Sequence, residues 1–79
     1  MKIVQIKWLD ICHGTPNWAY LDSLEVSPLT AVSVGMVVRE TDDFISIAQS
    51  YSEETGLIAD TLTIPKSVVK EIVELGLID

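Results

Sequence analysis

The chain contains one adjacent pair of reactive side chains, Cys12 and His13. A cysteine nucleophile needs a base within hydrogen-bond reach, and neighbouring residues of an extended strand point to opposite faces. A metal site needs three or four ligands, and the chain has no other cysteine or histidine. We therefore expect no catalytic residue, no metal and no cofactor here. The lone thiol has no partner for an internal disulfide and is typical of a reducing compartment, so we expect a cytoplasmic protein.

The acidic residues could carry out acid–base chemistry only inside an enclosed cleft. The sequence instead places Asp60 and the pairs Asp42–Asp43 and Glu53–Glu54 in or near turns. The glycines are isolated from one another, so no glycine-rich loop is available to hold a phosphate. We therefore expect the protein not to be an enzyme.

The aromatic residues Trp18 and Tyr20 lie in a long irregular segment, residues 12–29. Loops on a rigid scaffold often carry function, and Trp and Tyr are enriched in binding hot spots. Trp18 could instead fold back and plug one open end of a small barrel. We predict a plug for Trp18 and a surface contact for Tyr20, while Trp8 is expected to belong to the core.

Charge limits the partners that the protein can bind. Twelve acidic residues against five basic ones give a net charge of −7, and the bases are scattered along the chain. Binding to a nucleic-acid backbone normally needs a basic stripe, so direct nucleic-acid binding is not expected. Lys7, Arg39 and Lys66 could hold the phosphates of a nucleotide if they met beside an aromatic ring. No apolar run is long enough to span a membrane, and no signal peptide is expected.

Three segments alternate between apolar and polar residues with a period of two, and a fourth follows a hairpin loop without clean alternation; all four are predicted to be β-strands. These strands are expected at residues 2–11, 31–39, 44–51 and 57–64. Their inward-facing residues are expected to be Val4, Ile6, Trp8, Val32, Val34, Met36, Val38, Ile45, Ile47, Leu57, Ala59, Leu62 and Ile64. Gly35 is expected to mark a bend with a close backbone approach.

Two features of these strands need special backbone geometry. A bulge near Asp60 and Thr61 would keep the Asp60 carboxylate out of the core. Gly56 is expected to supply a positive φ in a hairpin loop. Val37, Phe44 and Val73 are expected to face outward, and these exposed apolar residues, together with the open strand edges, predict a homo-oligomer.

The tail allows two structures. Val68, Val69, Ile72 and Leu75 share one helical face. Equally, a single turn at 66–69 could precede a strand over 70–75.

Three stretches of the chain carry distinctive motifs: KWLD at 7–10, SVGMVVRETDDFISIAQS at 33–50 and LTIPKSVVKEIVEL at 62–75. They resemble a group of small, largely uncharacterised bacteriophage and prophage proteins. The last stretch also resembles the end of SH3-like and Sm-like barrels, in which a 3₁₀ turn separates the last two strands. The resemblance favours turn plus strand for the tail.

Together, pattern and resemblance predict one domain over residues 1–79, a mainly β, five-stranded SH3-like barrel with a long first loop. A four-stranded meander with a C-terminal helix is the alternative. The function expected is that of a non-enzymatic phage accessory protein in the host cytoplasm. It would bind a host or phage protein through its long loop or a strand edge. The alternatives are an oligomer that sequesters a nucleotide signal of antiphage defence, with Lys7, Arg39 and Lys66 on the phosphates, and an acidic nucleic-acid mimic.

Overall fold

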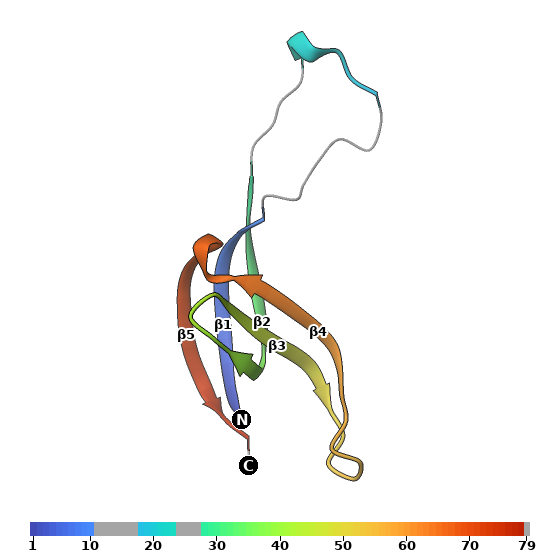
Figure 1. The fold of residues 1–79 in the computed structure, drawn as a ribbon, viewed down its shortest axis with the longest axis vertical. Helices are drawn as coiled ribbons and strands as arrows, with labels where there is room; N and C mark the ends of the chain where they lie inside the picture. The colour runs from blue at the N-terminus through green and yellow to red at the C-terminus, as the bar shows by residue number, and fades with distance from the viewer. Residues whose placement is uncertain (11–17, 24–27, 79) are drawn as a thin grey trace.

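The computed structural model describes residues 1–10, 18–23 and 28–78 and consists of one antiparallel sheet (Figure 1). The strands are β1 (Lys2–Asp10), β2 (Leu29–Glu40), β3 (Phe44–Tyr51), β4 (Ile58–Pro65) and β5 (Val69–Leu77). Two 3₁₀ turns accompany them in this part of the chain, η1 (Leu21–Ser23) and η2 (Lys66–Val68). The order across the sheet is β4-β3-β2-β1-β5. The prediction of a mainly β fold with five strands is therefore confirmed.

The tail forms the turn and strand rather than the helix, so the meander-plus-helix alternative is wrong. β5 pairs with β1 from Lys2–Leu77 to Trp8–Val69, along the edge of β1 that β2 leaves open. Pairing as a strand satisfies backbone groups on that edge which a helix would leave unpaired. The turn η2 is tied to the rest of the sheet, because the Lys66 backbone N–H donates to the Asp43 carbonyl at 2.8 Å.

The core lies on one face of this curved sheet. It consists of the buried side chains of Val4, Ile6, Ile45, Ile47 and Ile64. These five were all expected to face inward. Trp8 packs against this cluster as predicted, and its indole N–H donates to Ser33 Oγ at 3.0 Å. A buried tryptophan N–H needs such a partner.

In the first half of β2, the face that lies against the core is not the one that was predicted. Val4 pairs with Gly35 and Ile6 with Ser33, so the small residues of β2 face the core. Val32 and Val34 are 56% and 42% exposed. The valine alternation misled the prediction because a close approach of β3 and a polar contact with Trp8 decide which residues of β2 face inward. At Gly35 the inner face lies against the backbone of β3, and at Ser33 the hydroxyl accepts the Trp8 indole N–H.

The second half of β2 contains a bulge, which sequence alternation did not reveal. Val37 pairs with Ile47 and Arg39 with Ser46, so Val38 is the extra residue. A bulge shifts the alternation by one position. Val37 precedes the extra residue and shares the face of Gly35 and of its partner Ile47, so it packs against the core, and the prediction that it faces outward is wrong. The bulge instead turns Arg39 to the other face, opposite Ser46.

Gly35 lies in β2 one position before Met36, at which the pairing with β3 begins. The Ala48 carbonyl oxygen and the Ile47 side chain lie within 3.2 Å of the position that a Cβ on Gly35 would take. The predicted close backbone approach is confirmed.

β4 pairs with β3 without a register shift, so the bulge expected at Asp60 and Thr61 is wrong. The irregularity is instead a left-handed backbone at Asp60, with φ of 57°. Leu57 and Leu62 are 69% and 36% exposed, so of the four apolar residues expected inside only Ile64 is buried. Gly56 has φ of 74°, as the hairpin prediction required.

Candidate binding surfaces

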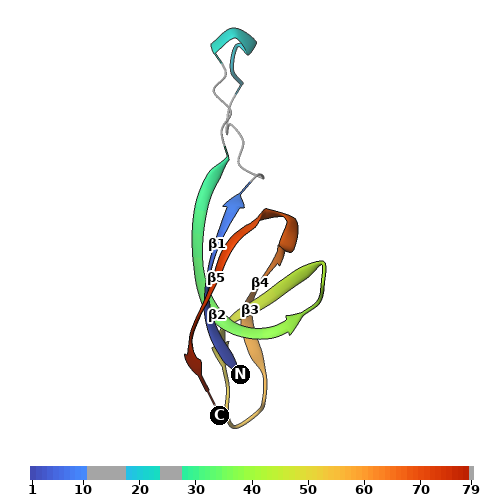
Figure 2. The same ribbon diagram turned by 90° about the vertical axis from the view of Figure 1, so that its left-hand side faces the viewer.

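Residues 18–23, here called the projecting segment, lie beyond the end of the sheet at which β1 finishes and β2 begins (Figures 1 and 2). Trp18, Tyr20 and Leu21 have exposed fractions of 103%, 86% and 85%. The prediction that Trp18 plugs the barrel is therefore wrong. The core is already filled by side chains of β1, β3 and β4, and the projecting segment lies away from it. The surface position expected for Tyr20 agrees with the structure.

The projecting segment is predominantly apolar. Trp18, Ala19 and Tyr20 contribute to the lining of a shallow hollow of about 390 Å³. Leu21 opens the 3₁₀ turn η1, which carries the only charge of the segment, Asp22. A large exposed tryptophan beside an exposed tyrosine and leucine has the composition of a protein-binding hot spot.

The three cations considered for phosphate binding do not meet beside these aromatics. Lys7 pairs with Val32 in the first half of β2, whereas Arg39 lies near the end of that strand. The Lys66 ammonium forms an ion pair with the Glu40 carboxylate, with 2.7 Å between Nζ and Oε2. Arg39 lines a hollow over the sheet, and neither Lys7 nor Lys66 contributes to the lining of that hollow.

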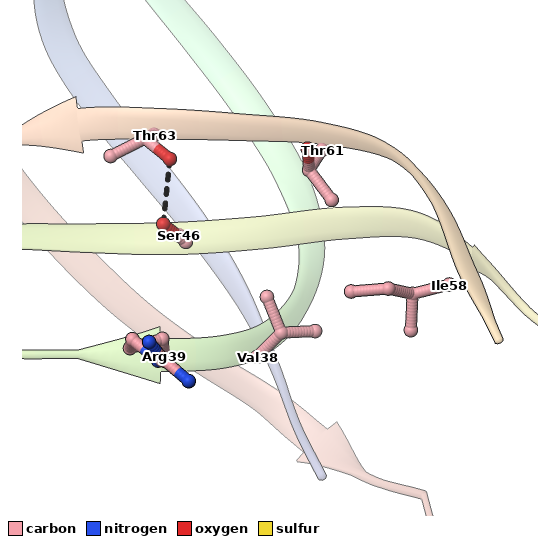
Figure 3. Close-up of a pocket in the computed structure, with 6 residues that line it drawn as sticks. All are labelled: Val38, Arg39, Ser46, Ile58, Thr61 and Thr63. Carbon is pink, nitrogen blue, oxygen red and sulfur yellow. Dashed lines mark hydrogen bonds between the residues drawn. The ribbon is translucent and has the colours of Figure 1, made fainter. Parts of the chain in front are cut away.

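That hollow, here called the hydroxyl hollow, measures about 290 Å³ and lies over β2, β3 and β4 (Figure 3). It is lined by Val38, Arg39, Ser46, Ile58, Thr61 and Thr63. Sequence reasoning selected Arg39 but missed the hydroxyl groups around it. The sequence signal for Ser46 was its position between Ile45 and Ile47, which places its hydroxyl on the face opposite the core. Ser46 and Thr63 face each other only once the register of β3 and β4 is known.

Within the described ranges, no group of three or more His, Cys, Asp or Glu side chains could hold a metal ion. No buried side-chain nitrogen or oxygen lacks a hydrogen-bond partner among these residues. The Cys12–His13 pair lies outside them. No helix in the described ranges is long and apolar enough to cross a membrane.

Comparison of the chain with protein families, curated proteins and solved structures finds no match. The function is therefore inferred from the projecting segment and the hydroxyl hollow.

Proposed function

We propose that the protein is a non-enzymatic binding protein that contacts another protein through its projecting segment. The observation that carries this proposal is the exposure of Trp18, Tyr20 and Leu21 at 103%, 86% and 85%. Their position beyond the sheet leaves these side chains accessible to a partner without any rearrangement of the core.

The exposed apolar surface of the projecting segment is a source of binding free energy. Burying one large apolar side chain is worth roughly 1.5–3 kcal/mol, and three lie within four positions of the chain here. Single exposed apolar residues are common on protein surfaces, whereas large contiguous apolar patches mark interaction sites. Tryptophan and tyrosine supply much contact area for little loss of side-chain freedom, which suits them to anchor an interface.

We further propose that the sheet is an SH3-like barrel and that the protein acts in the host cytoplasm as a phage accessory protein. The order β4-β3-β2-β1-β5 and the 3₁₀ turn between β4 and β5 support the barrel. The resemblance of residues 7–10, 33–50 and 62–75 to small phage proteins supports the origin. Nucleotide sequestration by an oligomer is the alternative, and its best support is the single guanidinium of the hydroxyl hollow.

The test is a binding comparison of three immobilised proteins: the parent chain, Trp18→Ala and Leu57→Ala. Leu57 is another exposed apolar residue, with an exposed fraction of 69%, but it lies in the β3–β4 hairpin. Its variant therefore controls for nonspecific apolar adhesion. A specific partner should bind the parent and Leu57→Ala equally. With that partner purified, calorimetry should give a dissociation constant at least about tenfold weaker for Trp18→Ala, in the range of hot-spot losses.

Stability separates this function from a structural role for Trp18. Because its side chain touches no core, Trp18→Ala should melt within about 2 °C of the parent. A core tryptophan would lose roughly 3–5 kcal/mol, which would largely unfold so small a domain. A destabilised Trp18→Ala, or a variant that binds the partner as tightly as the parent, would contradict the proposal.

A further inference from the structure

We infer that the hydroxyl hollow is a binding site for a small ligand that carries an oxyanion, a carboxylate or a phosphate monoester, next to a short apolar body. This inference does not depend on the projecting segment, since the hollow lies over β2, β3 and β4.

The polar half of the site is a row across three strands. The register pairs Arg39 with Ser46, and Ser46 with Thr63. The hydroxyl oxygens of Ser46 and Thr63 lie 2.7 Å apart and are hydrogen-bonded (Figure 3). A hydroxyl that takes part in this bond can still interact with a ligand oxygen, because each hydroxyl is one donor and two acceptors. Thr61 adds a third hydroxyl on β4.

The bulge in β2 creates the combination of groups in the hollow. Consecutive residues of a regular strand point to opposite faces, yet Val38 and Arg39 both line this hollow. The extra residue between the Val37–Ile47 and Arg39–Ser46 pairs makes this possible. Bulges commonly redirect a side chain in this way next to functional sites. Val38 and Ile58 then provide the apolar part of the lining, with Val38 between Arg39 and Ile58 in the view of Figure 3.

The local charge is opposite to that of the whole chain. The protein has a net charge of −7, yet no carboxylate of the described residues lines the hollow. The neighbouring Glu40 pairs with Ile45, on the alternate position of β2, and its carboxylate is held by Lys66 at 2.7 Å. Arg39 forms no ion pair within the described part of the chain. Its planar guanidinium can therefore offer the parallel N–H donors that carboxylates and phosphates accept.

Size limits the ligand. A volume of about 290 Å³ lies at the lower end of the roughly 300–1,000 Å³ usual for ligand sites. One guanidinium and a short apolar wall fit a molecule with one anionic group and one ring or short alkyl group. The probes chosen are therefore benzoate and phenyl phosphate, with benzamide as the neutral counterpart of benzoate.

The experiment is an NMR titration of the ¹⁵N-labelled protein at low ionic strength. Benzoate or phenyl phosphate should shift the backbone amides of Arg39, Ser46 and Thr63 in a saturable manner, and benzamide should not. The probe that binds more tightly identifies carboxylate or phosphate as the preferred group. Arg39→Gln should weaken binding about tenfold, as expected for loss of a charge-assisted hydrogen bond.

The matched control is Lys7→Gln. It makes the same change in net charge on β1, where Lys7 pairs with Val32. Its affinity should stay within about twofold of the parent, because Lys7 does not line the hollow. Equal weakening by both variants would mean nonspecific attraction and would overturn the inference. The inference would also be overturned by the absence of a saturable shift, by shifts centred elsewhere, or by benzamide binding as tightly as benzoate.

Discussion

Replacing Gly35 with alanine should destabilise the fold through a single methyl group. A Cβ built on Gly35 would lie 2.8 Å from the Ala48 carbonyl oxygen, and 3.1 and 3.2 Å from Cβ and Cδ1 of Ile47. Ordinary van der Waals contact begins near 3.4 Å, so the contact with the carbonyl is about 0.6 Å too short. The obstructing atom belongs to the backbone of β3, and Ile47 and Ala48 are fully buried. Relief therefore requires β2 and β3 to separate.

The expected cost follows from overpacking of cores, which is typically 1–3 kcal/mol. For a domain of this size, 1 kcal/mol lowers Tm by roughly 4–8 °C. We therefore expect Gly35→Ala to lower Tm by about 5–20 °C, with a correspondingly lower midpoint of urea unfolding. Gly35→Val should be worse, although valine ordinarily favours strands.

Gly76→Ala is the matched control. Gly76 also lies in a strand, β5, and nothing lies within 4 Å of the position that a Cβ on this residue would take. Both substitutions reduce the freedom of the unfolded chain equally, a stabilising effect of roughly 0.4–1 kcal/mol. Gly76→Ala should therefore melt at or above the parent temperature. If the two variants melted together, the steric argument for Gly35 would be wrong.

Three further predictions concern other parts of the chain. Asp60→Val should lose about 1–2 kcal/mol in urea unfolding, because a β-branched residue is strained at φ of 57°, whereas Asp60→Asn should be unchanged. Lys66→Gln should lose less than about 1 kcal/mol, a loss that vanishes in about 1 M salt, since the side chains of Lys66 and Glu40 are 31% and 44% exposed. Native mass spectrometry should show a homo-oligomer through the exposed apolar residues and strand edges, and a species of only 8.7 kDa at tens of micromolar would refute this.

Sequence alternation predicted the elements whose two faces differ sharply in polarity. In β1 and β3, isoleucine and valine alternate with polar residues, and Val4, Ile6, Ile45 and Ile47 are buried as expected. The turn and strand of the tail were distinguished from a helix only through the resemblance to small barrels. The apolar residues of 68–75 fit both periods, and pairing with β1 decides between them.

Alternation failed where tertiary contacts outweigh side-chain polarity. In β2, valines occupy both faces, so the pattern does not reveal that the close approach of β3 demands a glycine at position 35 on the inner face. The bulge at Val38 leaves no mark in composition, yet it reverses the faces of every residue that follows it. In β4 the alternation is interrupted near Asp60, where a bulge was expected. The structure has a left-handed backbone at Asp60 and no inserted residue.

Both candidate surfaces depend on the three-dimensional arrangement of the chain, but the sequence reveals more of the projecting segment than of the hydroxyl hollow. Trp18 and Tyr20 attract notice through residue type alone, but whether a tryptophan is buried depends on space in the core. Here Trp8 takes the position of a large aromatic beside the core, with its N–H satisfied by Ser33, and the core lies away from the projecting segment. The hydroxyl hollow, in contrast, is assembled from three strands and a bulge, and only Arg39 stands out in the sequence. A site made by register becomes visible only when the register is known.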